Sequence, residues 1–359
     1  MSKQQQLALV CGGQSAEHEV SLVSAHFVYR SVDRATYHLE VFYLDKQGRW
    51  FWVFDPDAFF SEKTLENKLS SGKGRQVAWV FGVQSYLQTL NDNPMPFTPD
   101  VVFPCSHGPY GEDGTLQGLL AMANVACVGS GVLSSAVNMD KDVCKQLLRQ
   151  ADLPVAPWVC VRSGEKHPNY AQLSSQLGKR LFVKAANMGS SVAIYYVNDQ
   201  ASFDDAMGRV FHYDDKALIE QAVDMVREVE CAVLIGKVAT ASMAGEVIVK
   251  DGFYDYDAKY IHTERTQFNV PADLPADMHD RISALAIKAV LATECRGMAR
   301  VDCFLTGDDQ VIIGEINTIP GFTAISLYPQ LWQLMGKPPA LLMHELIAEA
   351  ISRHQHKQS

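Results

Sequence analysis

Two carboxylates and a carboxamide, Asp302, Glu315 and Asn317, stand within residues 300–321, RVDCFLTGDDQVIIGEINTIPG, where two apolar runs flank a turn. The runs predict a β-hairpin, and a buried hairpin does not ordinarily carry Asp302, Glu315 and Asn317 on one face. Oxygen atoms of this kind suit Mg²⁺, which keeps several waters and usually shares its shell with nucleotide phosphates. The segment therefore predicts a divalent-cation site.

The strand register decides whether these side chains meet. If the turn is the four-residue TGDD, Leu305 pairs with Gln310. Arg300 then faces Glu315, and Asp302 lies diagonal to Glu315 on the same face. A slip of one residue would turn Asp302 to the other face. A surface salt bridge between Arg300 and Asp302 is the plainer alternative.

Two lysines are candidates for phosphate binding. Lys184 lies among apolar strand residues in RLFVKA and precedes the small, hydroxyl-bearing turn NMGSS, whose N–H groups can cap phosphate oxygens. Lys141 lies near the start of a helix. For each lysine considered alone, the alternative to phosphate binding is a side chain whose ammonium group reaches solvent. The chain has neither a G-x-x-x-x-G-K-[ST] loop nor a G-x-G-x-x-G fingerprint, which disfavours the P-loop and dinucleotide folds.

Two further loops carry chemistry near the N-terminus. GGQSAEHEVS follows the first strand and opens a helix, and Glu17 in it is a candidate partner for a substrate ammonium group. HGPYGEDGT follows a later strand and holds His107 and Glu112, while Pro109 in it lacks an N–H donor. An ordinary βα turn and a polar surface turn remain open as alternatives.

Composition limits the class of protein. A chain of 359 residues with 47% hydrophobic and 20% charged residues is long enough for two to three globular domains. It has neither an apolar stretch of membrane-spanning length nor a signal-peptide core. A formal charge of −10 argues against nucleic-acid binding. Eight scattered cysteines without a C-x-x-C pair indicate reduced thiols, so we expect a cytoplasmic protein without membrane or nucleic-acid partners.

The order of elements predicts an α/β (α+β) fold with three parts. Strand-like and helix-like segments alternate in the first third of the chain. The connector with Pro154 and Pro157 opens a second part, in which residues 180–197 predict a hairpin. The third part holds the acidic hairpin and helices near residues 278–294 and 339–354. We expect domains at residues 1–136, 137–222 and 223–359.

Seven motifs together resemble a known family. GGQSAEHEVSL, HGPYGEDGTLQGLL, MDKDVCKQLL, NMGSSV, YDYDAKY, GMARVDCFL and EINTIPGFT occur in the order seen in D-alanine-D-alanine ligases of the ATP-grasp superfamily. The similarity runs from Gly12 to about Tyr328. It implies an ATP-grasp fold with ATP between the central and C-terminal domains, and a homodimer.

The resemblance also implies roles for particular residues. Phosphates and the adenine or ribose side of ATP would be bound by Lys141, Lys184, Glu220 and Glu228. Two Mg²⁺ ions, replaceable by Mn²⁺, would be held by Asp302, Glu315 and Asn317. The first D-alanine would be held by Glu17 with Ser190 and Tyr260, next to His107. The carboxylate of the second D-alanine would be bound by Ser326, Leu327 and Lys259. The oxyanion of the reaction would be stabilised by Arg300 and Gly321.

The implied reaction joins two D-alanines for peptidoglycan precursor synthesis through an acyl phosphate. A ligase that joins D-alanine to D-lactate is the near alternative, although the YDYDAKY loop resembles the dipeptide-forming type. A catalytically silent ATP-binding module is the alternative from another class, and an oxidoreductase is disfavoured by the missing dinucleotide fingerprint. Ala185 and Ala193 depart from the proline and glycine that the family often has there, which bears on the motion of the phosphate loop.

Overall fold

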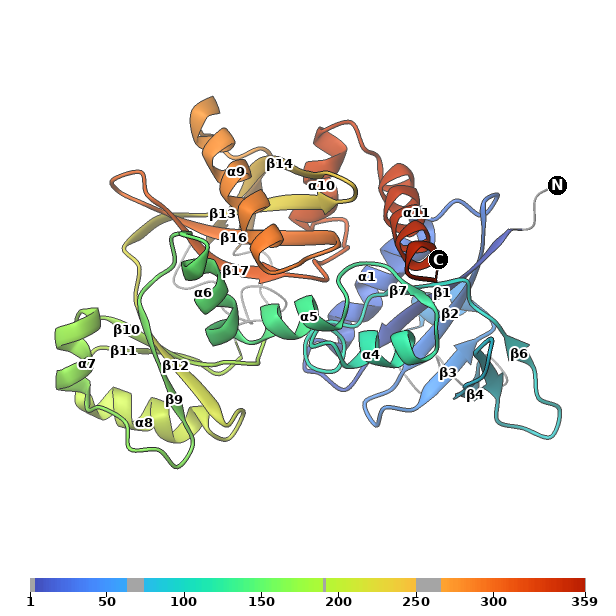
Figure 1. The fold of residues 1–359 in the computed structure, drawn as a ribbon, viewed down its shortest axis with the longest axis horizontal. Helices are drawn as coiled ribbons and strands as arrows, with labels where there is room; N and C mark the ends of the chain where they lie inside the picture. Colours follow the sequence, from blue (N-terminus) through green and yellow to red (C-terminus); the bar gives the residue numbers. More distant parts are fainter. Residues whose placement is uncertain (1–3, 63–73, 190–191, 250–265, 359) are drawn as a thin grey trace.

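The computed structural model describes residues 4–62, 74–189, 192–249 and 266–358. Three β-sheets organise these residues, with helices between and around them (Figure 1). The sheets take strands from residues 5–127, 158–221 and 225–317. We name the surrounding parts the N-terminal, central and C-terminal units. The expected domain limits remain a prediction.

The N-terminal unit is built on an eight-stranded sheet of order β6-β5-β4-β3-β2-β1-β7-β8. Strands β2, β1, β7 and β8 are parallel, and the others are joined antiparallel. Since β1 and β7 are parallel neighbours, the loops at their carboxyl ends leave the same edge of the sheet. The bounds are β1 (Gln5–Gly12), α1 (His18–Ser31), β2 (Tyr37–Leu44), β3 (Trp50–Val53), α2 (Pro56–Ser61), β4 (Gly74–Val80), β5 (Tyr86–Thr89), β6 (Pro96–Phe97), β7 (Val101–Pro104), α4 (Thr115–Met122) and β8 (Ala126–Cys127).

The central unit holds a four-stranded antiparallel sheet of order β11-β10-β12-β9. The hairpin predicted from residues 180–197 is confirmed as β10 and β11, with Lys184 paired to Ile194. In Figure 1, α5 and α6 lie between this unit and the N-terminal unit. The bounds are α5 (Val132–Met139), α6 (Lys141–Gln150), β9 (Trp158–Arg162), α7 (Tyr170–Leu177), β10 (Leu181–Ala185), β11 (Ile194–Val197), α8 (Gln200–Val210) and β12 (Lys216–Gln221).

The C-terminal unit holds a five-stranded antiparallel sheet of order β15-β14-β13-β16-β17. Its last helix crosses to the N-terminal unit, where Leu346 and Ile347 share one core with Leu9 and Phe103. The bounds are β13 (Met225–Ile235), β14 (Ala239–Val249), β15 (Thr266–Asn269), α9 (Ala276–Ala292), β16 (Gly297–Thr306), β17 (Val311–Asn317), α10 (Leu327–Leu334) and α11 (Pro339–Gln358).

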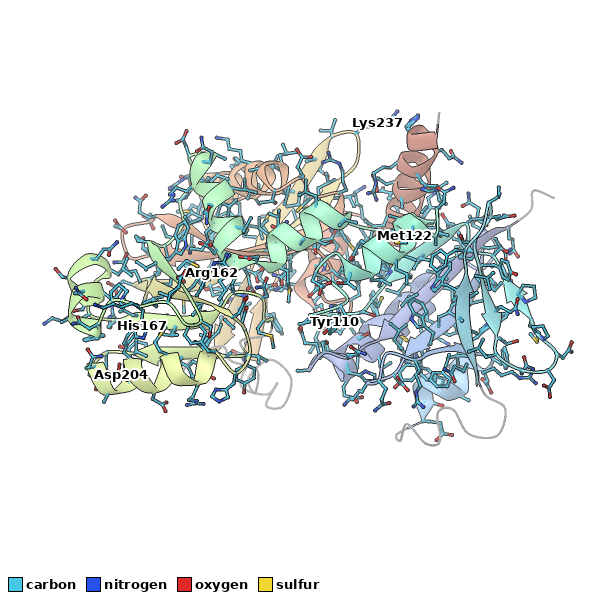
Figure 2. The ribbon with its side chains drawn as sticks, turned by 60° about the horizontal axis from the view of Figure 1, so that its bottom comes forward. Tyr110, Met122, Arg162, His167, Asp204 and Lys237 are labelled. Carbon is cyan, nitrogen blue, oxygen red and sulfur yellow. The ribbon has the colours of Figure 1, made fainter. Side chains whose placement is uncertain are left out.

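Figure 2 shows the N-terminal and central units from another side. Tyr110, in the loop after β7, lies on the side of the N-terminal unit that faces the central unit, whereas Met122 lies at the end of α4. His167 and Asp204 lie at the far end, on the central unit. Among the described helices, none combines the length and apolar character needed to span a bilayer.

The predicted register of the acidic hairpin was wrong. Near the turn, Leu305 pairs with Val311 and not with Gln310, a slip of one residue. A β-bulge between Asp302 and Cys303 then adds a second slip, so that Asp302 pairs directly with Glu315. Two slips restore the two-residue period of a strand, and both carboxylates keep the same face.

Candidate active site

The acidic cluster lies on three adjacent strands of the C-terminal sheet, β13, β16 and the edge strand β17. Strand pairing places two carboxylates, Glu230 and Glu315, on either side of Asp302. The guanidinium of Arg300 contacts both Asp302 oxygens, with 2.7 Å from Nε to Oδ1 and 2.7 Å from Nη2 to Oδ2. It also lies 3.1 Å from Glu230 Oε2. We define the acidic cluster as Glu230, Arg300, Asp302, Glu315 and Asn317.

Charge balance in this cluster favours a further cation. Burial lowers the pKa of Arg300, but the facing carboxylates of Asp302 and Glu230 raise it well above its ordinary value, so the guanidinium stays charged. Three carboxylates still outnumber one guanidinium. A buried surplus of negative charge is costly unless a positive ligand offsets it.

The donor set fits magnesium. Asn317 Nδ2 donates to Asp302 Oδ2 over 3.0 Å, and its carboxamide oxygen does not take part in that bond. Mg²⁺ needs only one or two protein carboxylates, because waters and phosphate oxygens complete its shell. Among the described residues, no group of three or more His, Cys, Asp or Glu side chains is placed to hold a metal by itself. Asp302, Glu315 and Asn317 therefore suit a cation that arrives with a nucleotide.

The basic cluster combines helix α6 with the central sheet, and we define it as Lys141, Lys145, Lys184 and Glu220. Glu220 on β12 is buried, and each of its carboxylate oxygens accepts from a different lysine. Oε1 lies 2.6 Å from Lys184 Nζ, and Oε2 lies 2.5 Å from Lys145 Nζ. Burial raises the pKa of Glu220, but the two lysines outweigh it and lower the pKa to about 2.

Lys141 is the member of the basic cluster that also interacts with the acidic cluster. Burial lowers its pKa, and the charge of Glu315 on the acidic hairpin opposes this shift. Its Nζ donates to the backbone oxygen of Met188, in the turn that follows β10. Lys141 therefore interacts electrostatically with Glu315 of the acidic cluster and with Glu220 of the basic cluster.

The start of α6 is fixed by one buried lysine, Lys216, which contacts the residues on both sides of Lys141 in the sequence. Lys216 Nζ lies 2.8 Å from Asp140 Oδ1 and 2.9 Å from Asp142 Oδ2. Asp140 also caps α6, since its side chain accepts from two backbone N–H groups of the first turn. Trp158 Nε1 donates to Asp142. These bonds hold the backbone that carries Lys141.

Glu17 and His107 come together as the parallel strands require. Glu17 follows β1 and His107 follows β7, and these strands end at the same edge of the sheet. Ser15 Oγ donates to His107 O over 2.6 Å and joins the two loops. The Glu17 carboxylate reaches the central unit: a Cβ added to Gly189 would lie only 2.8 Å from Glu17 Oε2. A side chain at position 189 would have to displace the end of the Glu17 side chain.

His107 is buried and held at both ring nitrogens. Its Nδ1 faces the carbonyl of Ile319 at 3.1 Å, and its Nε2 faces Ser24 Oγ at 2.9 Å. A carbonyl only accepts, so Nδ1 carries a proton. Burial lowers the pKa of His107, but Glu112 and then Glu17 raise it above the ordinary value.

The segment after β17 completes the described site. Thr323 N donates to Ser326 Oγ over 3.0 Å, and Phe322 N, next to Gly321, donates to Ser24 Oγ over 3.3 Å. Ser326 is the residue before α10. The side chain of Leu327 is buried in the core, so only its backbone can meet a substrate. Glu228 is half-buried on β13, two residues from Glu230 and on the same face.

Three predicted site residues, Ser190, Lys259 and Tyr260, lie outside the described residues. Four others were missed by sequence reasoning: Ser24, Lys145, Lys216 and Glu230. Only Glu230 had a local signal, because it stands two residues after Glu228 in a strand. Of the two departures, Ala185 is a buried strand residue, and Ala193 has a φ of 55°, a conformation that favours glycine.

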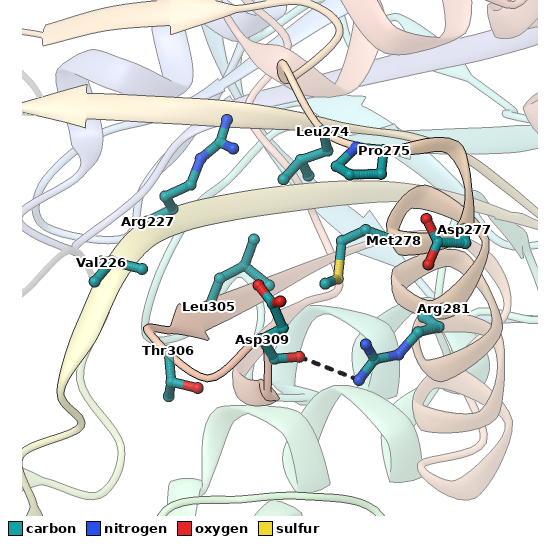
Figure 3. A pocket seen from close by; sticks show the side chains of 10 residues that line it. All are labelled: Val226, Arg227, Leu274, Pro275, Asp277, Met278, Arg281, Leu305, Thr306 and Asp309. Carbon is teal, nitrogen blue, oxygen red and sulfur yellow. Dashed lines mark hydrogen bonds between the residues drawn. The ribbon is translucent and has the colours of Figure 1, made fainter.

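One pocket lies away from both clusters. It has a volume of about 210 Å³ and lies between the start of α9 and the tip of the acidic hairpin (Figure 3). Arg281 Nη2 donates across it to the backbone oxygen of Asp309 over 3.2 Å. Leu305 lines the pocket and packs in one core with residues of α9. Because Leu305 and Asp302 are three residues apart in one strand, their side chains point to opposite faces of the sheet. The pocket is therefore on the opposite face of the sheet from the acidic cluster.

Comparisons with known proteins agree along the chain. The family described as D-ala D-ala ligase N-terminus matches residues 6–130, and that described as D-ala D-ala ligase C-terminus matches residues 147–348. The chain is 46% identical to D-alanine–D-alanine ligase A of Chromobacterium violaceum, covering 97% of this chain and 95% of that one. It is 43% identical to the ligase A of Salmonella typhimurium, covering 97% and 96%.

Solved structures give the same result. The D-alanine-D-alanine ligase of Coxiella burnetii superposes with a TM-score of 0.89 at 36% identity, covering 99% of this chain and 97% of that one. The VanG D-Ala:D-Ser ligase of Enterococcus faecalis superposes with a TM-score of 0.84 at 28% identity, covering 97% and 100%. The sheets, the two clusters and these matches define an ATP-grasp protein.

More narrowly, the chain belongs to the D-alanine–D-alanine ligase family. The matched segments and the nearly complete coverage of relatives confirm the family resemblance and the mixed α/β ATP-grasp fold. The assignments of individual residues remain predictions.

Proposed function

We propose that the protein joins two molecules of D-alanine at the expense of ATP, as a step in peptidoglycan precursor synthesis. The observation that supports this most directly is the pairing of the two clusters. Three carboxylates around one guanidinium suit a divalent cation, and three ammonium groups around one carboxylate suit phosphate oxygens. A Mg²⁺–nucleotide complex carries both charges.

In the first step, a carboxylate oxygen of one D-alanine attacks the γ-phosphorus of ATP, and ADP leaves. The product is D-alanyl phosphate, whose carbonyl is far more electrophilic than a carboxylate. Glu17 would hold the ammonium group of this D-alanine, next to His107. Lys141 and Lys184 would bind the phosphates and offset their charge. Glu220 and Glu228 would serve the adenine or ribose side.

In the second step, the free amine of the other D-alanine attacks that carbonyl and loses a proton, and inorganic phosphate leaves. The oxyanion of the tetrahedral intermediate would be stabilised by Arg300 and the Gly321 N–H group. Ser326, the backbone of Leu327 and Lys259 would bind the carboxylate of the second D-alanine. Ser190 and Tyr260 would join Glu17 in closing the site against water.

Two Mg²⁺ ions held by Asp302, Glu315 and Asn317, or Mn²⁺ in their place, would supply charge neutralisation at the phosphates. The protein side of that task lies in the acidic hairpin, where Arg300 fixes the position of Asp302 and leaves Glu315 facing Lys141. We also propose a cytoplasmic homodimer, a location with which eight free cysteines agree.

Incubation with ATP, Mg²⁺ and D-alanine tests the proposal. We expect ADP and D-alanyl-D-alanine to form in equal amounts, measured by a coupled assay and by product mass. ADP formation without dipeptide, or ATP binding without turnover, would contradict it. Competition with D-lactate and with D-serine, the acceptor in the name of the Enterococcus faecalis neighbour, determines the second substrate. A mixture dominated by the ester or by D-alanyl-D-serine would overturn the dipeptide assignment.

A further inference from the structure

Lys145 has a contact set that the proposed reaction does not use. It lies on the first turns of α6 and is buried, with a side chain that is 4% exposed. Its Nζ bonds Glu220 Oε2, and it lies 5.3 Å from the centroid of the Trp158 ring. A buried ammonium loses its hydration, so a residue of this kind requires an ionic partner. Glu220 is that partner.

Glu220 is shared by two lysines that differ in access. The Lys184 side chain is 16% exposed, four times the Lys145 value, and it holds the opposite carboxylate oxygen. Lys184 also lies on β10, which leads into the glycine turn. Of the two lysines, Lys184 is therefore the one that can reach a nucleotide phosphate.

The arrangement raises a question of charge. When Lys184 turns to a phosphate oxygen, one oxygen of a buried carboxylate loses its bonded cation. A buried carboxylate without a counter-charge is strongly unfavourable, and this penalty would hold Lys184 in place. Lys145 remains bonded to the second oxygen and is the less exposed of the two lysines.

We propose that Lys145 is a positioning residue for nucleotide binding: it keeps Glu220 neutralised so that Lys184 can leave Glu220 for a phosphate of ATP. The inference rests on the ATP-dependent function proposed above. It assigns to Lys145 an effect on ATP that acts through Glu220 and involves no contact with either D-alanine.

A double-mutant cycle tests this coupling. The variants are Lys145→Met, which keeps length and apolar volume, Glu220→Gln, and the two combined. The dissociation constant of Mg²⁺–ATP is measured by calorimetric titration without D-alanine. We expect Lys145→Met alone to weaken binding about tenfold, because Glu220 then retains Lys184. In the Glu220→Gln background, the same change should alter binding less than about twofold. Equal factors in both backgrounds would overturn the proposal.

Steady-state kinetics separates this role from a general structural one. Lys145→Met should raise the KM for ATP and leave the KM for D-alanine within about twofold, since the D-alanine subsites lie elsewhere. A parallel rise in both KM values would overturn the proposal. Lys145→Arg, which keeps the charge, should recover most of the ATP affinity. Lys337→Met breaks a remote ion pair with Glu345 and is the matched control.

The outcomes also separate the inference from the proposed function. If the wild-type protein makes dipeptide and the cycle is additive, only the inference falls. If the cycle shows coupling and no dipeptide forms, only the proposed function falls. A wild-type protein that binds no Mg²⁺–ATP would overturn both. If Lys145→Met alone does not fold, the charge-balanced double variant is compared with Glu220→Gln. A Mg²⁺–ATP dissociation constant ten times higher in the double variant would overturn the proposal.

Discussion

The acidic and basic clusters are built on the same plan with opposite charges. In the acidic cluster, carboxylates from three adjacent strands surround one guanidinium. In the basic cluster, ammonium groups from α6 and β10 surround one carboxylate on β12. Each cluster is thus anchored by one buried ion of the minority sign and keeps a surplus of the other sign. A single internal counter-ion therefore allows a fold to keep several like charges together in a site that is shielded from water.

The clusters differ in how they are supported. The acidic one rests on a continuous sheet, where each side chain is fixed by strand pairing. The basic one combines a helix with a separate sheet, and its contacts depend on the long, flexible side chains of its lysines. We expect the acidic cluster to be the more rigid and the basic cluster to rearrange when a nucleotide binds. Four changes test this comparison.

Glu315→Gln should have the largest effect. It removes one charge from the acidic cluster while keeping the volume of the side chain, and kcat should fall on the order of a hundredfold because charge stabilisation in the transition state is lost. Steady-state turnover at saturating Mg²⁺ measures it. Asp309→Asn, at the exposed tip of the same hairpin, is the control. A near-normal kcat would count against a metal role for Glu315.

Glu220→Gln tests the minority ion of the basic cluster. Its pKa of about 2 lies below the ordinary 4.5, so the ionised form stabilises the folded protein above about pH 4.5, and this contribution is lost as the pH falls towards 2. The shift corresponds to about 3 kcal/mol. Denaturant unfolding of wild type and variant should therefore differ most near neutral pH and converge in acid. A difference that is constant with pH would contradict the assignment.

Gly314→Ala should disturb the alignment of the acidic cluster. An added Cβ would lie 2.9 Å from Phe304 Cε2 and 3.3 Å from the backbone oxygen of Asp302, next to the bulge. We expect the free energy of unfolding to fall by about 2 kcal/mol through overpacking, with a severalfold loss of kcat. Gly307→Ala at the hairpin tip, where the nearest atom would be 3.9 Å away, should be close to neutral.

Ser24→Ala should have the smallest effect, because it lies outside both clusters. The hydroxyl bonds His107 Nε2 and accepts from Phe322 N, so its loss leaves a buried ring nitrogen without that partner. We expect a loss of about 1 kcal/mol in the free energy of unfolding and a raised KM for D-alanine with little change for ATP. Ser31→Ala, at the end of the same helix, is the matched change. An equal rise in both KM values would argue against a local role at the first subsite.

Local patterns in the sequence predicted much of the frame. The two-residue period of a strand placed Asp302 and Glu315 on one face, and β-strand and helix patterns predicted the β10–β11 hairpin and α9 and α11. The order of seven motifs identified the family. These features depend on residues close together in the chain, or on motifs that retain their order whatever the fold.

Tertiary structure decided the rest. The register of the acidic hairpin depends on a bulge beside Gly314, where the ring of Phe304 leaves no room for a Cβ. The pairing of Lys145 with Glu220 joins residues 75 positions apart, and nothing in the helix sequence KDVCKQLL distinguishes its buried lysine from a solvated one. Long-range contacts set the burial of a charge, and burial sets whether that charge is a surface detail or part of the site.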